Sequence, residues 1–133
     1  MKLINRKVPR ELLIVLEKWF TSCYSCVKWE TVFSAFYKLD TGVRQGGVLS
    51  PHLFCIYIDD VVKRVKSLSL GCNISHVCTS IILYADDLIL LAPTVHALQR
   101  LLNACEQELN YLDMIINPKK SVCMRIGPRF DIM

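Results

Sequence analysis

The sequence contains no apolar run long enough to cross a membrane, and this absence excludes one large class of protein. Its apolar stretches are interrupted by charged or polar residues well short of the roughly 20 residues that a spanning helix needs. No charged start followed by an apolar segment and a cleavage site stands at Met1. Internal repeats and low-complexity tracts are absent too. We therefore expect an intracellular, non-secreted globular protein that has no membrane partner.

Histidine is scarce, with 3 residues, and the 7 cysteines lack the spacing of a metal site. Cys23 and Cys26 form a single Cys-x-x-Cys pair without a second pair or a suitably spaced histidine, whereas structural zinc needs four ligands. The other cysteines stand singly among apolar residues, where they behave as small hydrophobic side chains. An odd number of cysteines without a signal peptide is typical of a reducing compartment. Neither structural zinc nor a disulfide framework is expected.

The length and composition fit one domain that can form a core. The chain has 133 residues and a hydrophobic content of 53%, near the upper end for a complete soluble domain. Apolar surface that a partner normally covers would explain this excess. A formal net charge of +4 is only mildly basic and is compatible with a nucleic-acid groove. Local basic clusters, such as Lys119 and Lys120, are candidates for phosphate contacts.

Two adjacent carboxylates inside an apolar stretch are the most informative feature. The sequence Tyr84-Ala85-Asp86-Asp87 lies between two short apolar runs, 81–83 and 88–92. An ionised carboxylate that leaves water loses several kcal/mol of solvation unless a cation or another partner replaces it. The flanking runs are too short for a buried helix and predict a strand, a tight turn and a strand. Hard oxygen ligands at such a turn suit Mg²⁺, while an Asp-Asp turn that merely faces solvent fits the local sequence equally well.

Two further segments accompany this tetrapeptide. Gly42-Val43-Arg44-Gln45-Gly46-Gly47-Val48-Leu49-Ser50-Pro51 precedes it, and Asn117-Pro118-Lys119-Lys120-Ser121 follows it. In this order and at these separations, the three segments resemble the palm of a reverse transcriptase (RNA-directed DNA polymerase), most closely the type from non-LTR, LINE-like retrotransposons. The match extends over nearly the whole chain. The expected fold is α+β, a partial polymerase palm with helices packed on one face of a small antiparallel sheet.

The resemblance implies catalytic roles for three side chains. It makes Asp86 the main metal ligand and Asp87 a supporting one, and it makes Lys120 the lysine that approaches the pyrophosphate leaving group. The cofactor would be Mg²⁺ or Mn²⁺, with two ions in the complete enzyme, for nucleotidyl transfer to a primer 3′ end. Without the resemblance, Lys120 would be interpreted as a solvated surface lysine after a helix-ending Asn-Pro.

The same resemblance implies contacts with the substrates. Tyr84 would lie near the primer end, and Gln45 and Gly46 would pack near the templating base and the incoming nucleotide. Arg44 adds positive charge beside them. The implied partners are an RNA template, a DNA primer, a dNTP and the rest of a polymerase polyprotein.

One departure from the family affects the expected activity. The family's palm has three catalytic aspartates, and the third comes from an earlier strand. No aspartate precedes Asp40, which lies too close to the Arg44-Gln45-Gly46 loop to take that place. We expect the first palm strand and the fingers upstream, and the thumb downstream, so that residues 1–133 form a single partial domain that is inactive alone. The alternatives are a catalytically dead retrotransposon remnant that at most binds nucleic acid, and an unrelated phosphoacceptor or metal-binding module.

A second Tyr-x-Asp-Asp, Tyr57-Ile58-Asp59-Asp60, is interpreted differently. Ser50-Pro51 is a typical helix start, and apolar residues follow at intervals of three and four. The pattern predicts an amphipathic helix with Asp59 and Asp60 on its polar side, paired with Lys63 and Arg64.

The remaining segments are predicted from similar signals. Pro9 opens one helix, and Pro93-Thr94 caps another that Asn117-Pro118 stops. Its apolar stripe comprises Leu98, Leu101, Leu102, Cys105, Leu109 and Leu112. Residues 22–29 and 33–39 are expected to form a β pair, and residues 122–126 a final short strand.

Overall fold

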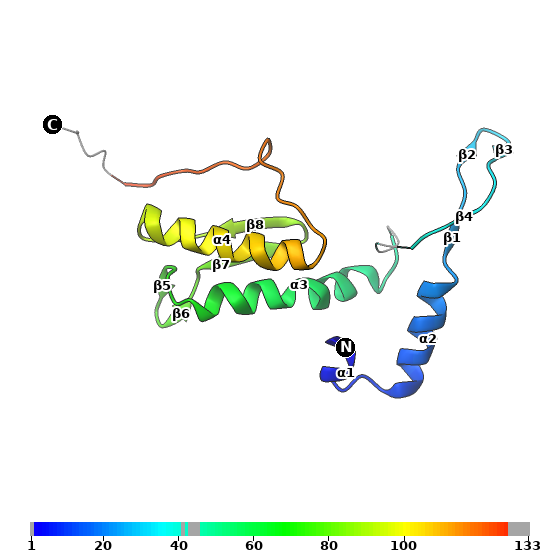
Figure 1. Cartoon of the computed structure of the whole chain (residues 1–133), viewed down its shortest axis with the longest axis horizontal. Coiled ribbons are helices and arrows are strands. Elements are labelled where there is room, and N and C mark those ends of the chain that lie inside the picture. The colour runs from blue at the N-terminus through cyan, green and yellow to red at the C-terminus, as the bar shows by residue number, and fades with distance from the viewer. Residues whose placement is uncertain (1, 41, 43–45, 128–133) are drawn as a thin grey trace. The chain divides into compact units, whose positions relative to one another are not determined.

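The computed structural model describes residues 2–40, 42 and 46–127 (Figure 1). The chain divides into two compact units, Met1–Asp59 and Asp60–Met133. The boundary falls within one long helix, and each unit is described by itself. Helices and short antiparallel strands occur in a mixed α+β arrangement, as expected. The described strands form four separate two-stranded ladders, however, so the single small sheet that was expected is not observed.

The described part of the first unit contains two complete helices, a β hairpin and the beginning of the long helix that crosses the boundary. The longer helix begins directly after Pro9, whose φ of −54° suits a helix start, so the prediction from this proline is confirmed. The β pair is confirmed as well, in two short ladders on either side of Val27 and Ser34, whose main chains are joined by a 2.9 Å hydrogen bond. The elements are α1 (Lys2–Asn5), α2 (Arg10–Thr21), β1 (Tyr24–Ser25), β2 (Lys28–Trp29), β3 (Val32–Phe33) and β4 (Tyr37–Lys38).

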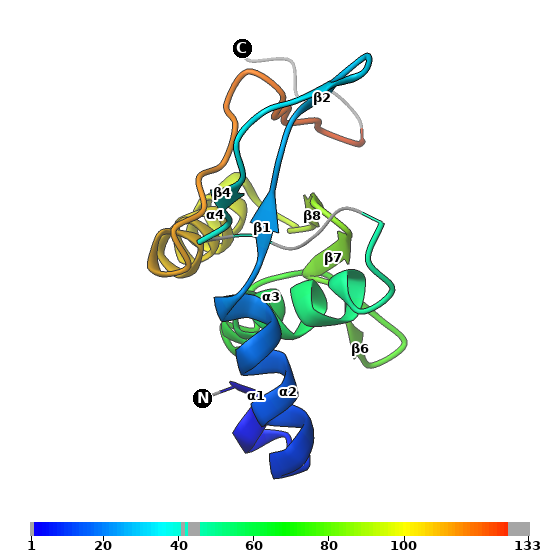
Figure 2. The same cartoon turned by 90° about the vertical axis from the view of Figure 1, so that its right-hand side faces the viewer.

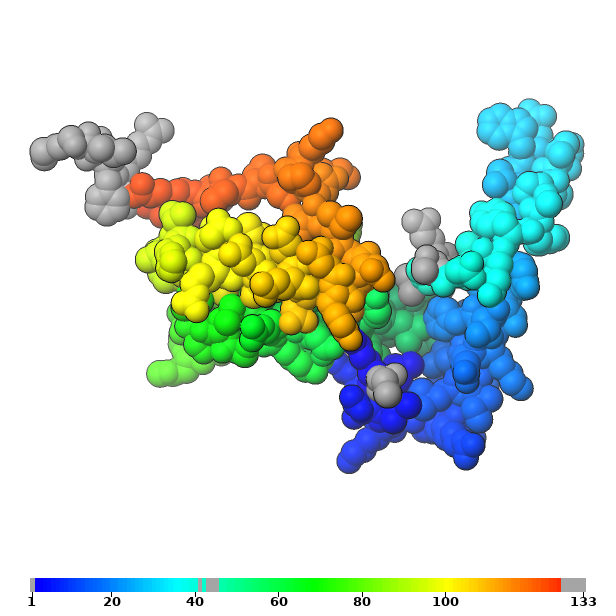
Figure 3. All heavy atoms as spheres, viewed as in Figure 1, coloured from blue at the N-terminus to red at the C-terminus, as the bar shows by residue number. Residues whose placement is uncertain are grey.

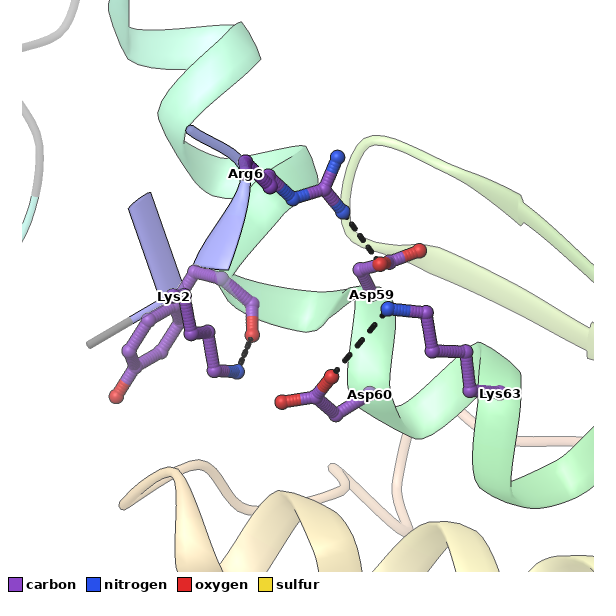
Figure 4. A network of polar contacts seen from close by, with 6 residues as sticks. Lys2, Arg6, Asp59, Asp60 and Lys63 are labelled. Carbon is purple, nitrogen blue, oxygen red and sulfur yellow. Dashed lines mark hydrogen bonds and ion pairs between the residues drawn. The ribbon is translucent and has the colours of Figure 1, made fainter. Parts of the chain in front are cut away.

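Helix α3 (Ser50–Ser67) contains the second Tyr-x-Asp-Asp sequence, as predicted. Asp59 forms an ion pair with Arg6, and Asp60 lies 3.8 Å from the Lys63 ammonium (Figure 4). The apolar side of the same helix is buried, since Val61 and Val65 are completely inaccessible to solvent. These aspartates therefore lie on the polar side of an amphipathic helix.

Helix α4 (Val95–Tyr111) provides most of the core of the second unit. Its N-cap is Thr94, whose hydroxyl accepts a hydrogen bond from the Ala97 N–H at 3.1 Å, as the cap prediction requires. Figure 3 shows the yellow atoms of this helix against green atoms of the same unit, and the Arg64 guanidinium lies 4.0 Å from the Glu108 carboxylate of α4. The predicted stripe is largely confirmed, although Leu98 is only half-buried and Leu102 is exposed. The buried residues of α4 are Ala97, Leu101, Ala104, Cys105 and Leu109.

The end of α4 differs from the prediction. The helix ends at Tyr111, before Asn117-Pro118. Asp113 has a φ of 55°, the Met114 N–H donates to the Leu109 carbonyl at 2.9 Å, and the Asp113 N–H donates to the Asn110 carbonyl at 3.1 Å. This is a Schellman motif, which normally uses glycine at the left-handed position. Because aspartate occupies this position instead of glycine, the sequence carried no signal for the helix end.

Four strands complete the second unit. The ladders β5 (Asn73–Ile74) with β6 (Val77–Cys78) and β7 (Ile81–Tyr84) with β8 (Asp87–Leu90) are antiparallel, and the first was not predicted. The predicted strand at 122–126 is wrong. Within the described part of the chain this segment has no strand partner, and Val122 is 94% exposed, so neither pairing nor burial stabilises a strand. Among the described residues, no helix combines the length and apolar character that a membrane crossing requires.

Candidate catalytic hairpin

Strands β7 and β8 form the hairpin that the sequence predicted. Tyr84 pairs with Asp87, which leaves Ala85 and Asp86 as a two-residue turn. Ala85 has a φ of 50°, and two-residue hairpin turns require a positive φ at the first central residue because this matches the twist of the strands. Asp86 therefore lies in the turn itself, and Asp87 begins the returning strand.

Strand alternation determines which side chains face solvent. Ile81 is buried, and the paired Leu83 and Leu88 are half-buried on the same inward face. Tyr84 and Asp87 form the pair on the opposite face, and Tyr84 is 82% exposed. The hairpin thus uses its inward leucines and isoleucine for packing and presents the tyrosine and the aspartates to solvent.

The two carboxylates do not lose the solvation energy that their apolar flanks in the sequence suggested. Both Asp86 and Asp87 are exposed at the turn, so they retain water although apolar runs flank them in sequence. Across the described ranges, no ion pair or side-chain hydrogen bond engages either carboxylate. The turn therefore offers two adjacent hard oxygen ligands that no cation among the described side chains neutralises. No group of three or more His, Cys, Asp or Glu side chains that could hold a metal ion occurs among the described residues.

The base of the hairpin is held by the preceding β5–β6 segment. The Leu91 N–H donates to the Ser80 carbonyl at 3.0 Å, and the Cys72 N–H donates to the Leu91 carbonyl at 3.2 Å. Ser80 is completely buried, and a Cβ added to Gly71 would lie only 2.0 Å from the Ser80 Cβ. Gly71 therefore allows the two segments to approach closely. The sequence analysis assigned no role to Gly71, so it missed this support.

Two thiols of the second unit have shifted pKa values. Hydrogen bonds from Ser80, whose hydroxyl lies 3.1 Å from the sulfur, lower the pKa of the Cys78 thiol. Burial raises the pKa of the Cys105 thiol in α4 to about 11, because the thiolate would lose its hydration. Cys105 is thus a hydrophobic core residue, as the sequence interpretation of the isolated cysteines expected.

The structure does not gather all the predicted site residues. Tyr84, Asp86 and Asp87 meet at the hairpin, whereas Lys120 lies in an exposed turn at 117–121. Both Figure 1 and Figure 2 show this orange turn apart from the β7–β8 hairpin. Gly46, with a φ of 78°, is exposed in the first unit. The predicted Arg44 and Gln45 lie outside the described residues.

Comparison with known proteins identifies the class of this chain. Residues 2–130 match the family described as reverse transcriptase (RNA-dependent DNA polymerase), and the chain belongs to this family. The match to the family extends across the β7–β8 hairpin and the 117–121 turn. The fold class and the aspartate hairpin therefore occur in a chain of reverse transcriptase type.

Two curated relatives come from mobile elements. The chain is 34% identical over 86 residues to the retrovirus-related Pol polyprotein from type-2 retrotransposable element R2DM of Drosophila melanogaster. This alignment covers 65% of the chain. The chain is also 34% identical over 87 residues to the corresponding polyprotein from type-1 retrotransposable element R2 of Nasonia vitripennis, again covering 65% of this chain. These matches confirm the resemblance to reverse transcriptases of non-LTR retrotransposons. The aligned part spans 8% of the length of each of these relatives.

Proposed function

We propose that this chain carries the metal-binding hairpin of an RNA-directed DNA polymerase and forms a partial palm, residues 1–133, of a longer polyprotein. The observation that supports this function best is the β7–β8 turn, where Asp86 and Asp87 are exposed next to Tyr84 in a chain of the reverse transcriptase family. Family membership also argues against the alternative of an unrelated phosphoacceptor or metal-binding module. The catalytically dead remnant is the remaining alternative.

The chemistry of the hairpin suits a hard divalent cation. Asp86 is the proposed principal ligand and Asp87 the supporting one, because Mg²⁺ usually takes one or two protein carboxylates and completes its coordination with water and substrate phosphates. A divalent ion bound there, as one of the two of the complete enzyme, would supply positive charge for the primer 3′ hydroxyl and the leaving pyrophosphate. The exposure of both carboxylates supports this assignment, since their oxygens are accessible without any rearrangement of the hairpin.

Further residues have proposed roles in holding the substrates. The ring of Tyr84, on the same face of the hairpin as Asp87, would contact the primer end. Arg44, Gln45 and Gly46 would lie near the templating base and the dNTP, where a glycine lets the backbone approach closely. The proposed partners are an RNA template, a DNA primer, a dNTP and the rest of the polyprotein.

Lys120 has a proposed electrostatic role. Its ammonium would stabilise the charge that develops on the leaving pyrophosphate, or donate a proton to it. The lysine is exposed, so its charge is accessible to a phosphate. Because its turn lies apart from the hairpin, this role requires the 117–121 segment to approach the hairpin when substrate is bound (Figure 1).

Metal titration of matched variants tests the hairpin assignment. Mn²⁺ affinity, measured by the electron paramagnetic resonance signal of the free ion, should fall at least tenfold in Asp86→Asn, while folding is unchanged because the side chain is exposed. Asp60→Asn is the matched control, since Asp60 lies in the second Tyr-x-Asp-Asp on α3. The Mn²⁺ affinity of this variant should equal that of the wild type. Unchanged Mn²⁺ affinity in Asp86→Asn would refute the ligand assignment. A loss of affinity in Asp60→Asn would mean that the metal binds at the second Tyr-x-Asp-Asp instead.

Primer extension tests the proposed incompleteness of the site. With two of the three family carboxylates, the isolated chain should not extend a DNA primer on an RNA template in the presence of Mg²⁺ and dNTPs. Extension that Asp86→Asn abolishes would contradict the need for a third carboxylate from outside these residues. It would also exclude the catalytically dead remnant.

A further inference from the structure

Asn117 organises the turn that contains Lys120. Its side-chain Oδ1 accepts a hydrogen bond from the Lys119 N–H at 3.1 Å. Its main-chain carbonyl accepts two more, from the Lys120 N–H at 3.2 Å and from the Ser121 hydroxyl at 2.8 Å. Three hydrogen bonds thus converge on one residue, and all of them are local to positions 117–121.

The other residues of the turn have complementary physical roles. Pro118 follows Asn117 and fixes φ near −65°, which suits the first central position of a β-turn closed by the Lys120 N–H. An asparagine side chain that bonds to the N–H two residues on forms an Asx turn, which makes the reversal independent of any neighbouring strand. The turn is therefore preformed, although the following residues 121–127 adopt no helix or strand.

We propose that Asn117 is a positioning residue that holds the turn so that Lys120 is presented to a pyrophosphate group. This inference rests on the proposed role of Lys120. The lysines at 119 and 120 are both exposed, and the hydrogen bonds of Asn117 use only their main-chain N–H groups. Asn117 thus fixes the main chain at Lys119 and Lys120 and leaves the Lys120 ammonium available for phosphate.

Asn117→Ala removes the Oδ1 acceptor and keeps the main-chain carbonyl. Loss of one such hydrogen bond corresponds to about a fivefold change in an equilibrium. Amide hydrogen exchange at Lys119 should therefore accelerate about fivefold. The dissociation constant for inorganic pyrophosphate, followed by the amide NMR signal of Ser121 without metal, should increase by a similar factor. Asn117→Ser should restore both values toward those of the wild type, because a serine hydroxyl can accept the same type of hydrogen bond.

Two controls separate this inference from the proposed function. Asn103→Ala removes an exposed asparagine acceptor of α4, which receives the Gln99 amide at 2.8 Å, and it should change neither measurement. Lys120→Ala should abolish the pyrophosphate response while the exchange rate at Lys119 stays as in the wild type. No pyrophosphate response in the wild type would overturn both the role of Lys120 and the presentation by Asn117. Unchanged exchange in Asn117→Ala, or faster exchange with unchanged affinity, would overturn the positioning role alone.

Discussion

Replacement of Gly71 by alanine should destabilise the second unit through the base of the candidate catalytic hairpin. The new Cβ would lie 2.0 Å from the Ser80 Cβ, 2.4 Å from the Ser80 Cα and 3.0 Å from the Leu91 carbonyl oxygen. Two of these atoms belong to the main chain, so no side-chain rotation relieves the overlap. Ser80 is also completely buried, which leaves no free space beside it.

The magnitude follows from the kind of atoms that must move. Overpacking in a filled core typically costs 1–3 kcal/mol, and a clash with paired backbone belongs at the upper end, about 3 kcal/mol. Urea unfolding followed by circular dichroism measures this loss. With an m-value of about 2 kcal/mol per M, the midpoint should decrease by about 1.5 M. The Leu91 N–H to Ser80 hydrogen bond should weaken, which raises amide exchange at Leu91.

Gly127→Ala is the control for this substitution. Gly127 has nothing within 4 Å of an added Cβ, and although its φ of 128° disfavours alanine, it lies in an exposed segment without helix or strand, whose backbone can adjust without disturbing the core. Its replacement should therefore change the free energy of unfolding by less than about 1 kcal/mol. A Gly71→Ala variant that loses no more stability than this control, with unchanged exchange at Leu91, would refute the proposed close approach of the two segments.

Two other variants test the turn and the core. Ala85→Gly should increase the free energy of unfolding by about 1 kcal/mol, because glycine adopts the φ of 50° without the left-handed penalty; denaturant melts that show a loss would exclude a positive φ at this residue. The pKa of Cys105 is raised by burial to about 11 from an ordinary 9.0, so the thiol stabilises the fold fully below pH 9 and this contribution is lost as the pH rises through 11. Cys105→Ala should remove that part of the decline in stability, as measured by urea midpoints at pH 8 and pH 10.5, and an identical decline in both proteins would contradict the assignment.

Local sequence signals predicted the elements that are stabilised by residues close to one another in the sequence. The hairpin at 81–90 was predictable because two short apolar runs surround a polar tetrapeptide, and its turn needs only two residues. The helix start at Thr94 was also predictable, since the threonine hydroxyl caps the N–H of Ala97. In both cases the stabilising groups are close in sequence.

Features that depend on tertiary contacts or on unusual residues were not predictable. The ladder β5–β6 turns at Ser75 and His76, whose φ values of 45° and 70° are typical of asparagine or glycine, so no turn signal marked it. The expected strand at 122–126 has suitable residues, but the described residues provide no strand beside it. The hydrogen bonds that Asn117 accepts within the 117–121 turn were also missed, although an Asn-Pro pair is a recognisable turn signal.

The metal ligands that we propose are Asp86 and Asp87, which would bind a divalent ion at the β7–β8 turn. Paramagnetic broadening of the amide NMR signals by sub-stoichiometric Mn²⁺ tests this assignment most directly, because it locates the ion on the chain. We expect the signals of Ala85, Asp86 and Asp87 to broaden first, those of Asp59 and Asp60 on α3 to remain sharp, and excess Mg²⁺ to reverse the effect. Broadening centred on Asp60, or spread evenly over all exposed carboxylates, would contradict the claim.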